Sequence, residues 1–149
     1  MAGAVLWLHA IGGAVVVLAC ISLALAAAAL LGEEEGGEEF ARRVLPGLNW
    51  LASAGAVVLL ITGIGNLIAA GAVRHYRFST TFRAVLATKL ILFVLIAGGL
   101  WGLWRVAAGV RRGGAAFPKR ALRRTVMLAG ACALMGAIAL ALGLWLVGS

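Results

Sequence analysis

The sequence is short of acidic residues and of charge in general. Only 12% of its 149 residues are charged and 64% are hydrophobic, whereas a soluble domain carries about 25% charged residues. It contains no Asp, and all of its glutamates lie between Glu33 and Glu39. A water-soluble globule and a disordered chain are therefore excluded. Catalysis by paired carboxylates within the apolar segments is excluded as well.

Several motifs of soluble enzymes are also missing. There is no Cys-x-x-Cys pair, no closely spaced pair of histidines, no glycine-rich phosphate loop ending in lysine and no Ser-His-Asp triad. These absences leave a hydrolase or nucleotide-dependent enzyme of the soluble type without support. The only prolines, Pro46 and Pro118, are expected outside the interiors of the long apolar segments.

What is present is a set of four long apolar segments, at 4–31, 44–70, 84–110 and 125–147. About 20 apolar residues in a helix span a bilayer, and continuous rather than alternating hydrophobicity argues against a barrel. The first segment has no basic start and is too long for the core of a signal peptide. The sequence thus predicts an all-α fold, a single four-helix bundle integral to a membrane.

Basic residues are concentrated in the short gaps between these segments. The formal net charge of +8 is therefore interpreted as a topology signal and not as a nucleic-acid interface. Together the predicted loops 32–43 and 111–124 carry eight Lys and Arg residues, against three in the loop between the second and third helices. The positive-inside rule then places those two loops in the cytoplasm and both termini on the non-cytoplasmic side of a bacterial inner membrane. The Glu33–Glu39 run is interpreted as a solvated turn, with a cation-collecting or partner-docking role as the alternative.

Small residues on the last two helices predict close helix packing. Gly98 and Gly102 form a Gly-x-x-x-Gly step, and Gly130, Gly136 and Gly143 follow on the fourth helix. Such residues let transmembrane helices approach one another closely.

Three polar side chains are predicted at one depth near the outer leaflet. His9 lies about one and a half turns into the first helix, Lys89 lies equally far into the third, and Asn66 lies about one turn before the second helix ends. Ionisable groups inside a bilayer are costly, by about 2.5–3.5 kcal/mol on insertion scales. We therefore expect these three residues to form one cofactor-binding site.

Each of the three residues also has a simpler interpretation. Lys89 could extend its amine to the headgroups, His9 could bond a carbonyl at the interface, and Asn66 could join two helices. However, no acidic residue lies within the membrane segments to neutralise Lys89. A lysine kept inside the bundle would be either a neutral ligand or an ammonium paired with an anionic cofactor group. Haem b offers both, through its iron and its propionates.

A second group of residues contains soft donors at greater depth. Cys132 and Met135 share a face of the fourth helix, and Cys20 lies near the middle of the first. Thiol and thioether groups suit Cu(I), so these residues and His9 are candidate copper ligands. The alternative is that they pack as ordinary hydrophobic side chains.

Several short motifs resemble the membrane domain of the copper-resistance D (CopD) family. Residues 59–69 read LLITGIGNLIA, and they are followed by FRAVLATKLILFVLIAGGLWGLWR and FPKRALRR. The family has a Thr-Gly-x-x-Asn step, a lysine early in the next helix, a basic exit and a later proline. In this sequence Thr62, Gly63, Asn66, Lys89, Arg105 and Pro118 stand at those places.

The opening WLHAIGGA is similar to the first helix of CopD-like proteins and of HemJ-type protoporphyrinogen oxidases. The latter resemblance implies haem b associated with His9 and Lys89. The sequence departs from these families in length, in having valines after the first-helix histidine, and in lacking a later third-helix histidine.

Together these features predict a small CopD/HemJ-like membrane protein that binds haem b or copper near the outer leaflet. Its expected role is electron transfer or copper and haem handling, and any enzymatic activity would be that of a haem-dependent membrane oxidoreductase. The alternative is a non-catalytic accessory subunit that packs against a larger membrane complex or against its own copies.

Overall fold

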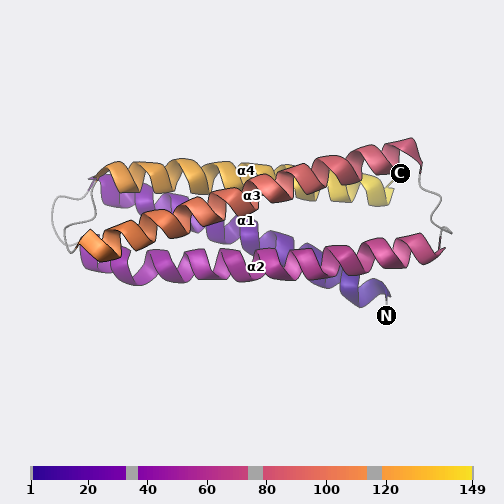
Figure 1. Ribbon diagram of the computed structural model, residues 1–149, viewed down its shortest axis with the longest axis horizontal. Coiled ribbons are helices and arrows are strands. Elements are labelled where there is room, and N and C mark those ends of the chain that lie inside the picture. The colour runs from indigo at the N-terminus through magenta and orange to yellow at the C-terminus, as the bar shows by residue number, and fades with distance from the viewer. Residues whose placement is uncertain (1, 33–36, 74–78, 114–118, 149) are drawn as a thin grey trace.

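The chain folds into four long helices that run side by side (Figure 1). The computed structural model describes residues 2–32, 37–73, 79–113 and 119–148. The helices are α1 (Ala2–Gly32), α2 (Gly37–Val73), α3 (Thr80–Gly113) and α4 (Lys119–Gly148). The predicted all-α four-helix arrangement is confirmed.

Each helix is long and apolar enough to cross a membrane. The candidate spans are Ala4–Gly32, Arg43–Ala72, Thr80–Gly109 and Lys119–Trp145. Large hydrophobic side chains lie exposed on all four helices, among them Trp7, Ile64, Val94 and Leu144. Soluble monomers rarely leave so much contiguous apolar surface uncovered. The bundle therefore has the outer surface of a protein in contact with a lipid bilayer.

The helices extend beyond the predicted apolar segments at their ends. Glu38 and Glu39, expected in a loop, lie within α2, and α4 begins at Lys119. Charged Glu, Lys and Arg are good helix formers, so the apolar pattern marks the membrane-crossing part of a helix and not its end. The expectation that Pro46 lies outside a helix interior is wrong, because Pro46 lies within α2. Pro118 lies outside the described residues.

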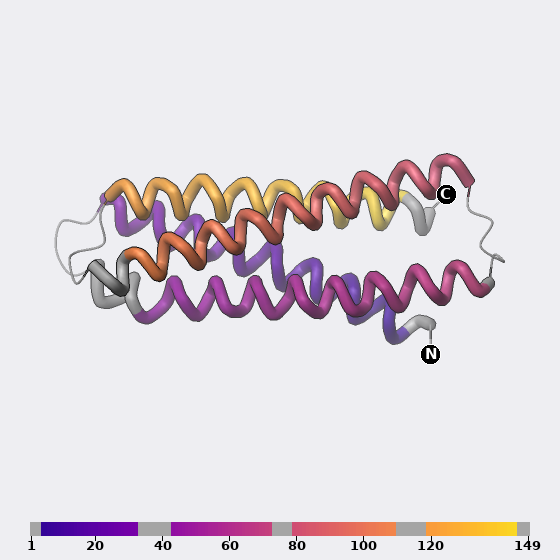
Figure 2. The backbone as a smooth tube through the Cα atoms, in the orientation of Figure 1, coloured from indigo at the N-terminus to yellow at the C-terminus, as the bar shows by residue number. Residues whose placement is uncertain are grey.

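The helices contact one another unequally. Helix α1 packs along both α2 and α4, and α3 packs along α4, whereas the contact between α2 and α3 is the smallest of the four contacts between neighbouring helices. Figure 2 shows α2 and α3 together near the end where α2 begins, and then diverging toward the chain termini. We call the two parts of the bundle the basic half (16–32, 37–56, 94–113 and 119–137) and the termini half (2–15, 57–73, 80–93 and 138–148).

The hydrophobic core lies in the basic half. Its most deeply buried side chains include Val16, Cys20, Leu23 and Cys132, and all four helices contribute to the cluster. Among the described side chains of the termini half, Val85 is the one buried hydrophobic residue, and it stands apart from that cluster. The buried hydrophobic core is thus concentrated in the basic half. In the termini half α2 and α3 diverge, but α1 still packs closely on α2 and α4 through Gly12 and Gly13.

Glycines set the close approaches between helices. A Cβ added to Gly55 would lie 2.9 Å from Val16 across the α1–α2 contact, and one added to Gly136 would lie 2.8 Å from Val17 across the α1–α4 contact. On α3, Gly99 and Gly102 face α4, whereas Gly98 has no atom within 4 Å of such a Cβ. Of the small residues predicted to permit close packing, Gly102, Gly136 and Gly143 lie at close approaches between helices. Gly98 and Gly130 do not, so the Gly98–Gly102 step does not act as a unit.

Candidate functional site

His9 of α1 is joined to α2 by a hydrogen bond in the termini half. The His9 Nδ1 atom lies 2.9 Å from the Thr62 Oγ1 atom, and the histidine is half-buried. Thr62 in turn donates its hydroxyl proton to the Val58 carbonyl at 2.7 Å, with Leu59 O at 3.4 Å. A threonine within a helix commonly bonds back to the preceding turn in this way.

This chain of bonds favours one tautomer of the neutral imidazole. A hydroxyl has one proton, and that of Thr62 is directed to the backbone of its own helix. The Thr62 oxygen is therefore the acceptor, and His9 Nδ1–H is the donor. The Nε2 atom of the neutral ring is left with its lone pair free of a proton, which is the state in which histidine binds metals.

Lys89 of α3 approaches the same region. Its half-buried ammonium is close enough to His9 for the two groups to interact electrostatically. A Cβ added to Gly143 of α4 would lie 3.0 Å from Lys89 Nζ, and one added to Gly63 of α2 would lie 3.3 Å from His9 Cε1. The two glycines thus leave room for the basic side chains between the helices.

Asn66 lies one turn beyond Thr62 on the same face of α2. It is half-buried, and no hydrogen bond of its amide is found to another described residue. Among the three predicted residues, His9 and Lys89 are near enough to influence each other electrostatically, and neither is hydrogen-bonded to Asn66 in the described part of the chain. The direct α2 partner of His9 is Thr62.

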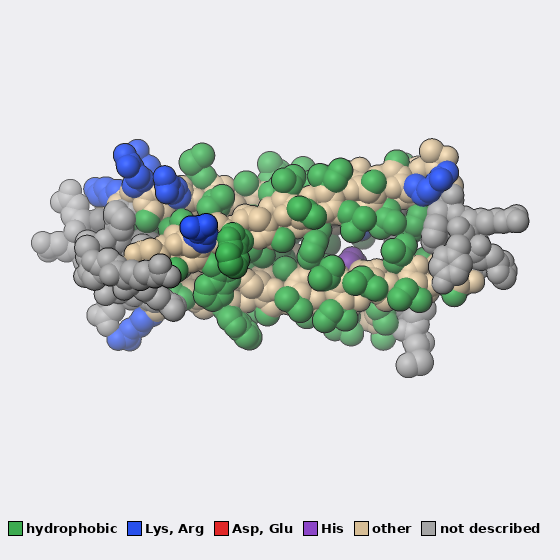
Figure 3. All heavy atoms as spheres, in the orientation of Figure 1, with side chains coloured by type: hydrophobic (Ala, Val, Ile, Leu, Met, Phe, Trp, Pro, Cys, Tyr) green, Lys and Arg blue, Asp and Glu red, His purple; other side chains and the backbone are tan. Residues whose placement is uncertain are grey.

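The surface is hollowed between α2 and α3 in the termini half. Figure 3 shows a histidine side chain within this hollow, and His9 is the one histidine among the described residues. The hollow follows from the divergence of α2 and α3 and from the lack of buried hydrophobic side chains at this level. It opens at the side of the bundle rather than at its end.

The cysteines form a separate pair in the basic half. Cys20 and Cys132 are both fully buried free thiols whose side chains lie near each other, and Cys132 Sγ donates a hydrogen bond to the Ile96 carbonyl at 3.7 Å. Met135 is half-buried and packs against the same core. Cys20 is about 16 Å from His9 along α1. The four candidate metal ligands therefore do not converge on one ion.

A cluster of three polar residues, Asn49, Ser53 and Trp104, lies at the α2–α3 contact of the basic half. The Trp104 indole N–H donates to Ser53 Oγ at 3.0 Å, and Ser53 donates to the Asn49 carbonyl at 2.8 Å. The Asn49 side chain is only 3% exposed, yet neither of its amide atoms has a hydrogen-bond partner among the described residues. Trp104 thus bridges α2 and α3 where they lie together.

Sequence reasoning gave no role to Asn49, and it treated Gly143 only as a small residue that permits close helix packing. Thr62 was visible only as part of a motif, because its hydrogen-bond partner is far away in the sequence. No group of three or more His, Cys, Asp or Glu side chains that could hold a metal ion is found in the described ranges.

Comparison of the chain with protein-family models, with curated proteins and with solved structures finds no match.

Proposed function

We propose that this protein is a small membrane haem protein, with haem b held in the hollow between α2 and α3 and used for electron transfer. The observation that carries the proposal is the His9–Thr62 hydrogen bond. It leaves the His9 Nε2 lone pair free for iron and holds the ring through its other nitrogen. Haem-ligating and metal-ligating histidines are typically oriented in this manner.

The surroundings of His9 also fit such a group. The termini half has few buried hydrophobic side chains among the described residues. A planar cofactor would therefore occupy space that side chains leave unfilled. Apolar residues of α2 and α3 would contact the porphyrin faces. The lateral position of the hollow gives access from the bilayer rather than from water.

In this proposal Lys89 has one of two roles. As an ammonium it would pair with a haem propionate, because no acidic residue of the membrane segments is available to it. As a neutral amine it would be the second ligand. Asn66 would donate a hydrogen bond from the α2 side, and Thr62 would hold the His9 ring. The bound haem would supply one-electron chemistry.

The resemblance to CopD-like and HemJ-type proteins supports the same two residues, because His9 and Lys89 stand at the positions that it associates with haem b. We also propose the topology that the basic connections favour, with residues 32–43 and 111–124 in the cytoplasm and both termini outside. The haem would then lie near the outer leaflet of an inner membrane.

Copper handling is a second candidate, and the Cys20–Cys132 contact favours it. Two thiols in contact offer the soft donors that Cu(I) prefers, with Met135 nearby on α4. Copper would then bind in the basic half, remote from His9. The two candidates therefore predict different cofactors at different ends of the bundle.

The decisive experiment is a visible absorption spectrum and a metal assay on one gently purified preparation. We expect a Soret band that His9→Ala abolishes and that His75→Ala, the variant of the other histidine, leaves unchanged. Copper that is lost in Cys20→Ser but retained in His9→Ala would support the second candidate instead. A preparation with neither haem nor stoichiometric copper would refute both and favour an accessory subunit, whose partner helix would fill the hollow.

A further inference from the structure

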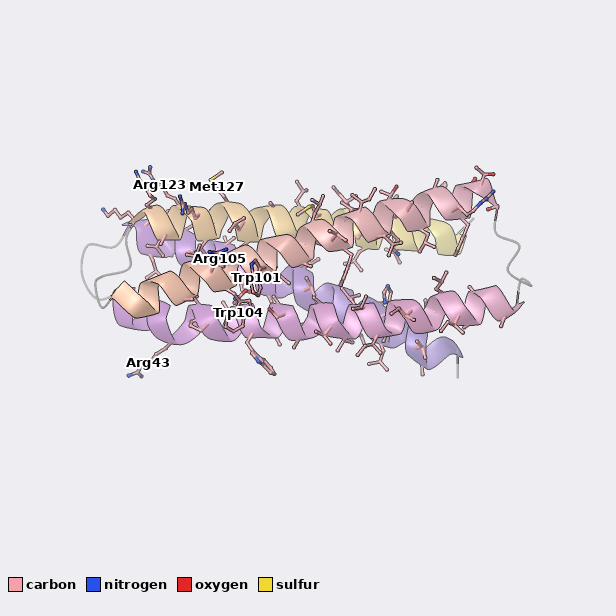
Figure 4. The ribbon with its side chains drawn as sticks, viewed as in Figure 1. Arg43, Trp101, Trp104, Arg105, Arg123 and Met127 are labelled. Carbon is pink, nitrogen blue, oxygen red and sulfur yellow. The ribbon has the colours of Figure 1, made fainter. Side chains whose placement is uncertain are left out.

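Lys89 is set apart from the other basic side chains by its burial. Among the Lys and Arg side chains that the structure describes, Lys89 is half-buried and all the others are exposed. Figure 4 shows two of the exposed ones, Arg43 and Arg123, projecting outward from α2 and α4 in the basic half. A lysine within a membrane segment commonly extends its amine to the headgroups. The inward position of the Lys89 amine therefore needs a physical cause.

The amine of Lys89 lies against α4. Gly99 of α3 faces Cys132 of α4, and the two helices are antiparallel (Figure 1). The same pairing, continued toward the termini half, brings Lys89 level with the turn of α4 that contains Gly143. A Cβ added to Gly143 would lie 3.0 Å from Lys89 Nζ. The amine is thus about as deep in the bundle as the backbone of its own residue.

His9 of α1 comes to the same level. Gly136 of α4 faces Val17 of α1, and this antiparallel pairing, continued along α1, brings His9 level with the turn that contains Gly143. The imidazole is held against α2 by its hydrogen bond, whereas the Lys89 amine lies against α4. The two basic groups are near enough to interact electrostatically, so they meet at one level from different sides of the bundle.

Gly143 differs from the glycines that set the contacts between helices. A Cβ added to Gly13, Gly55 or Gly136 would lie 2.7–2.9 Å from a hydrophobic side chain of a neighbouring helix. At Gly143 the one atom of another described helix within 4 Å is the end of the flexible Lys89 side chain. No hydrogen bond of this amine to another described residue is found. A methyl group at Gly143 would therefore displace the amine without separating the helices.

We infer that Gly143 is a positioning residue, which keeps the Lys89 amine inside the bundle and level with His9 by leaving it room against α4. A side chain at this position forces the flexible lysine out of that room and toward the headgroup layer. The consequence for cofactor binding rests on the proposed haem site, in which Gly143 keeps the amine beside the ligand histidine. The position of the amine itself does not depend on a cofactor.

Acylation of the lysines in the detergent-purified protein tests the inference without any cofactor. The chain has only two lysines, Lys89 and Lys119, so the exposed Lys119 is a control within the same molecule. A water-soluble acylating reagent should modify Lys89 more slowly than Lys119, as measured by mass spectrometry of the peptides. In Gly143→Ala the rate at Lys89, relative to Lys119, should rise at least about threefold, because the displaced amine reaches the solvated surface.

Gly130→Ala is the matched control on the same helix. A Cβ added to Gly130 meets nothing within 4 Å, so this variant should leave the rate at Lys89 unchanged. Thermal unfolding should show no lower midpoint for Gly143→Ala than for the unsubstituted protein. The inference is overturned if Lys89 reacts as fast as Lys119 in the unsubstituted protein, or if the two alanine variants have the same rate at Lys89. A lowered midpoint would show a packing role for Gly143 and overturn it as well.

Haem content separates this inference from the proposed function. In a preparation that contains haem b, Gly143→Ala should reduce the haem retained per protein, and it should cause no further loss in a Lys89→Met background, which has no amine to displace. An equal loss in both backgrounds would mean that Gly143 does not act through Lys89. A preparation without haem would refute the proposed function, whereas the acylation rates would still decide the role of Gly143.

Discussion

The two halves of the bundle are built on different principles. In the basic half, small residues bring the helices together, and the core around Cys20, Leu23 and Cys132 is almost completely shielded. In the termini half, α2 and α3 diverge, and two half-buried basic residues, His9 and Lys89, lie between the helices. The first half provides stability, and the second leaves space that a ligand could fill.

This contrast explains how a small bundle can hold ionisable groups in a membrane. Polar groups in an apolar interior are destabilising unless they are paired. The well-packed basic half fixes the helices, so the termini half need not optimise its own packing. Functional sites commonly lie where the side chains of a protein are packed less well than elsewhere. Substitutions matched between the halves test the comparison.

The largest difference is expected for truncation of a leucine. Leu23 is 2% exposed in the basic half and Leu60 is 45% exposed in the termini half. Leu23→Ala should destabilise the protein by about 2–5 kcal/mol through lost burial and a cavity, and Leu60→Ala by less than about 1 kcal/mol. Unfolding in detergent, followed by circular dichroism, measures both. Equal losses would mean that the termini half carries as much of the stability as the basic half.

Adjacent glycines on α3 give the next test. A methyl group on Gly99 would overlap the Cys132 sulfur, whereas one on Gly98 meets nothing within 4 Å. Gly99→Ala should therefore destabilise the bundle by about 1–3 kcal/mol through overpacking. Gly98→Ala should be neutral or stabilising by up to about 1 kcal/mol, since alanine favours helix. If Gly99→Ala is as stable as Gly98→Ala, the α3–α4 contact is looser than the Cys132 position implies.

The fold was largely predictable from the sequence because its signal is strong and local. Four apolar segments gave four helices, and only their ends and Pro46 were misjudged, since charge does not stop a helix when it leaves the membrane. The unequal packing was not predictable. Gly98 and Gly99 are identical in type, and their different roles depend on the rotation of α3 against α4.

The candidate site was predictable in its charges but not in its geometry. Burial depth along each helix brought His9, Lys89 and Asn66 to one level by simple counting of residues. Counting could not reveal that Thr62, rather than Asn66 one turn away on the same face, meets His9, because this depends on how α1 and α2 are shifted against each other along their axes. It also could not reveal that Asn49 lies in the core.

Replacing one asparagine by leucine in each half tests how much a polar side chain reduces the free energy of unfolding there. Asn49 is buried and its amide has no partner among the described residues, whereas Asn66 is half-buried at the hollow. Asn49→Leu should stabilise the protein by about 1–2 kcal/mol, because an unsatisfied amide is replaced by an apolar group. Asn66→Leu should leave the free energy of unfolding nearly unchanged. Destabilisation by Asn49→Leu would instead show that the amide makes an interaction of its own.

Substitution of Thr62 is expected to have the smallest effect on the free energy of unfolding. Its main consequence is a change in the tautomer of His9. Thr62→Val keeps the shape of the side chain but removes the acceptor of the His9 Nδ1–H bond, which should lower stability by about 0.5–1.5 kcal/mol. The ring should then lose its single tautomer, a change that nitrogen chemical shifts of His9 detect without any cofactor. Thr62→Ser retains the hydroxyl and should retain the tautomer. If valine leaves the His9 shifts unchanged, another group fixes the ring, and the termini half is more highly organised around His9 than the Thr62 contact alone implies.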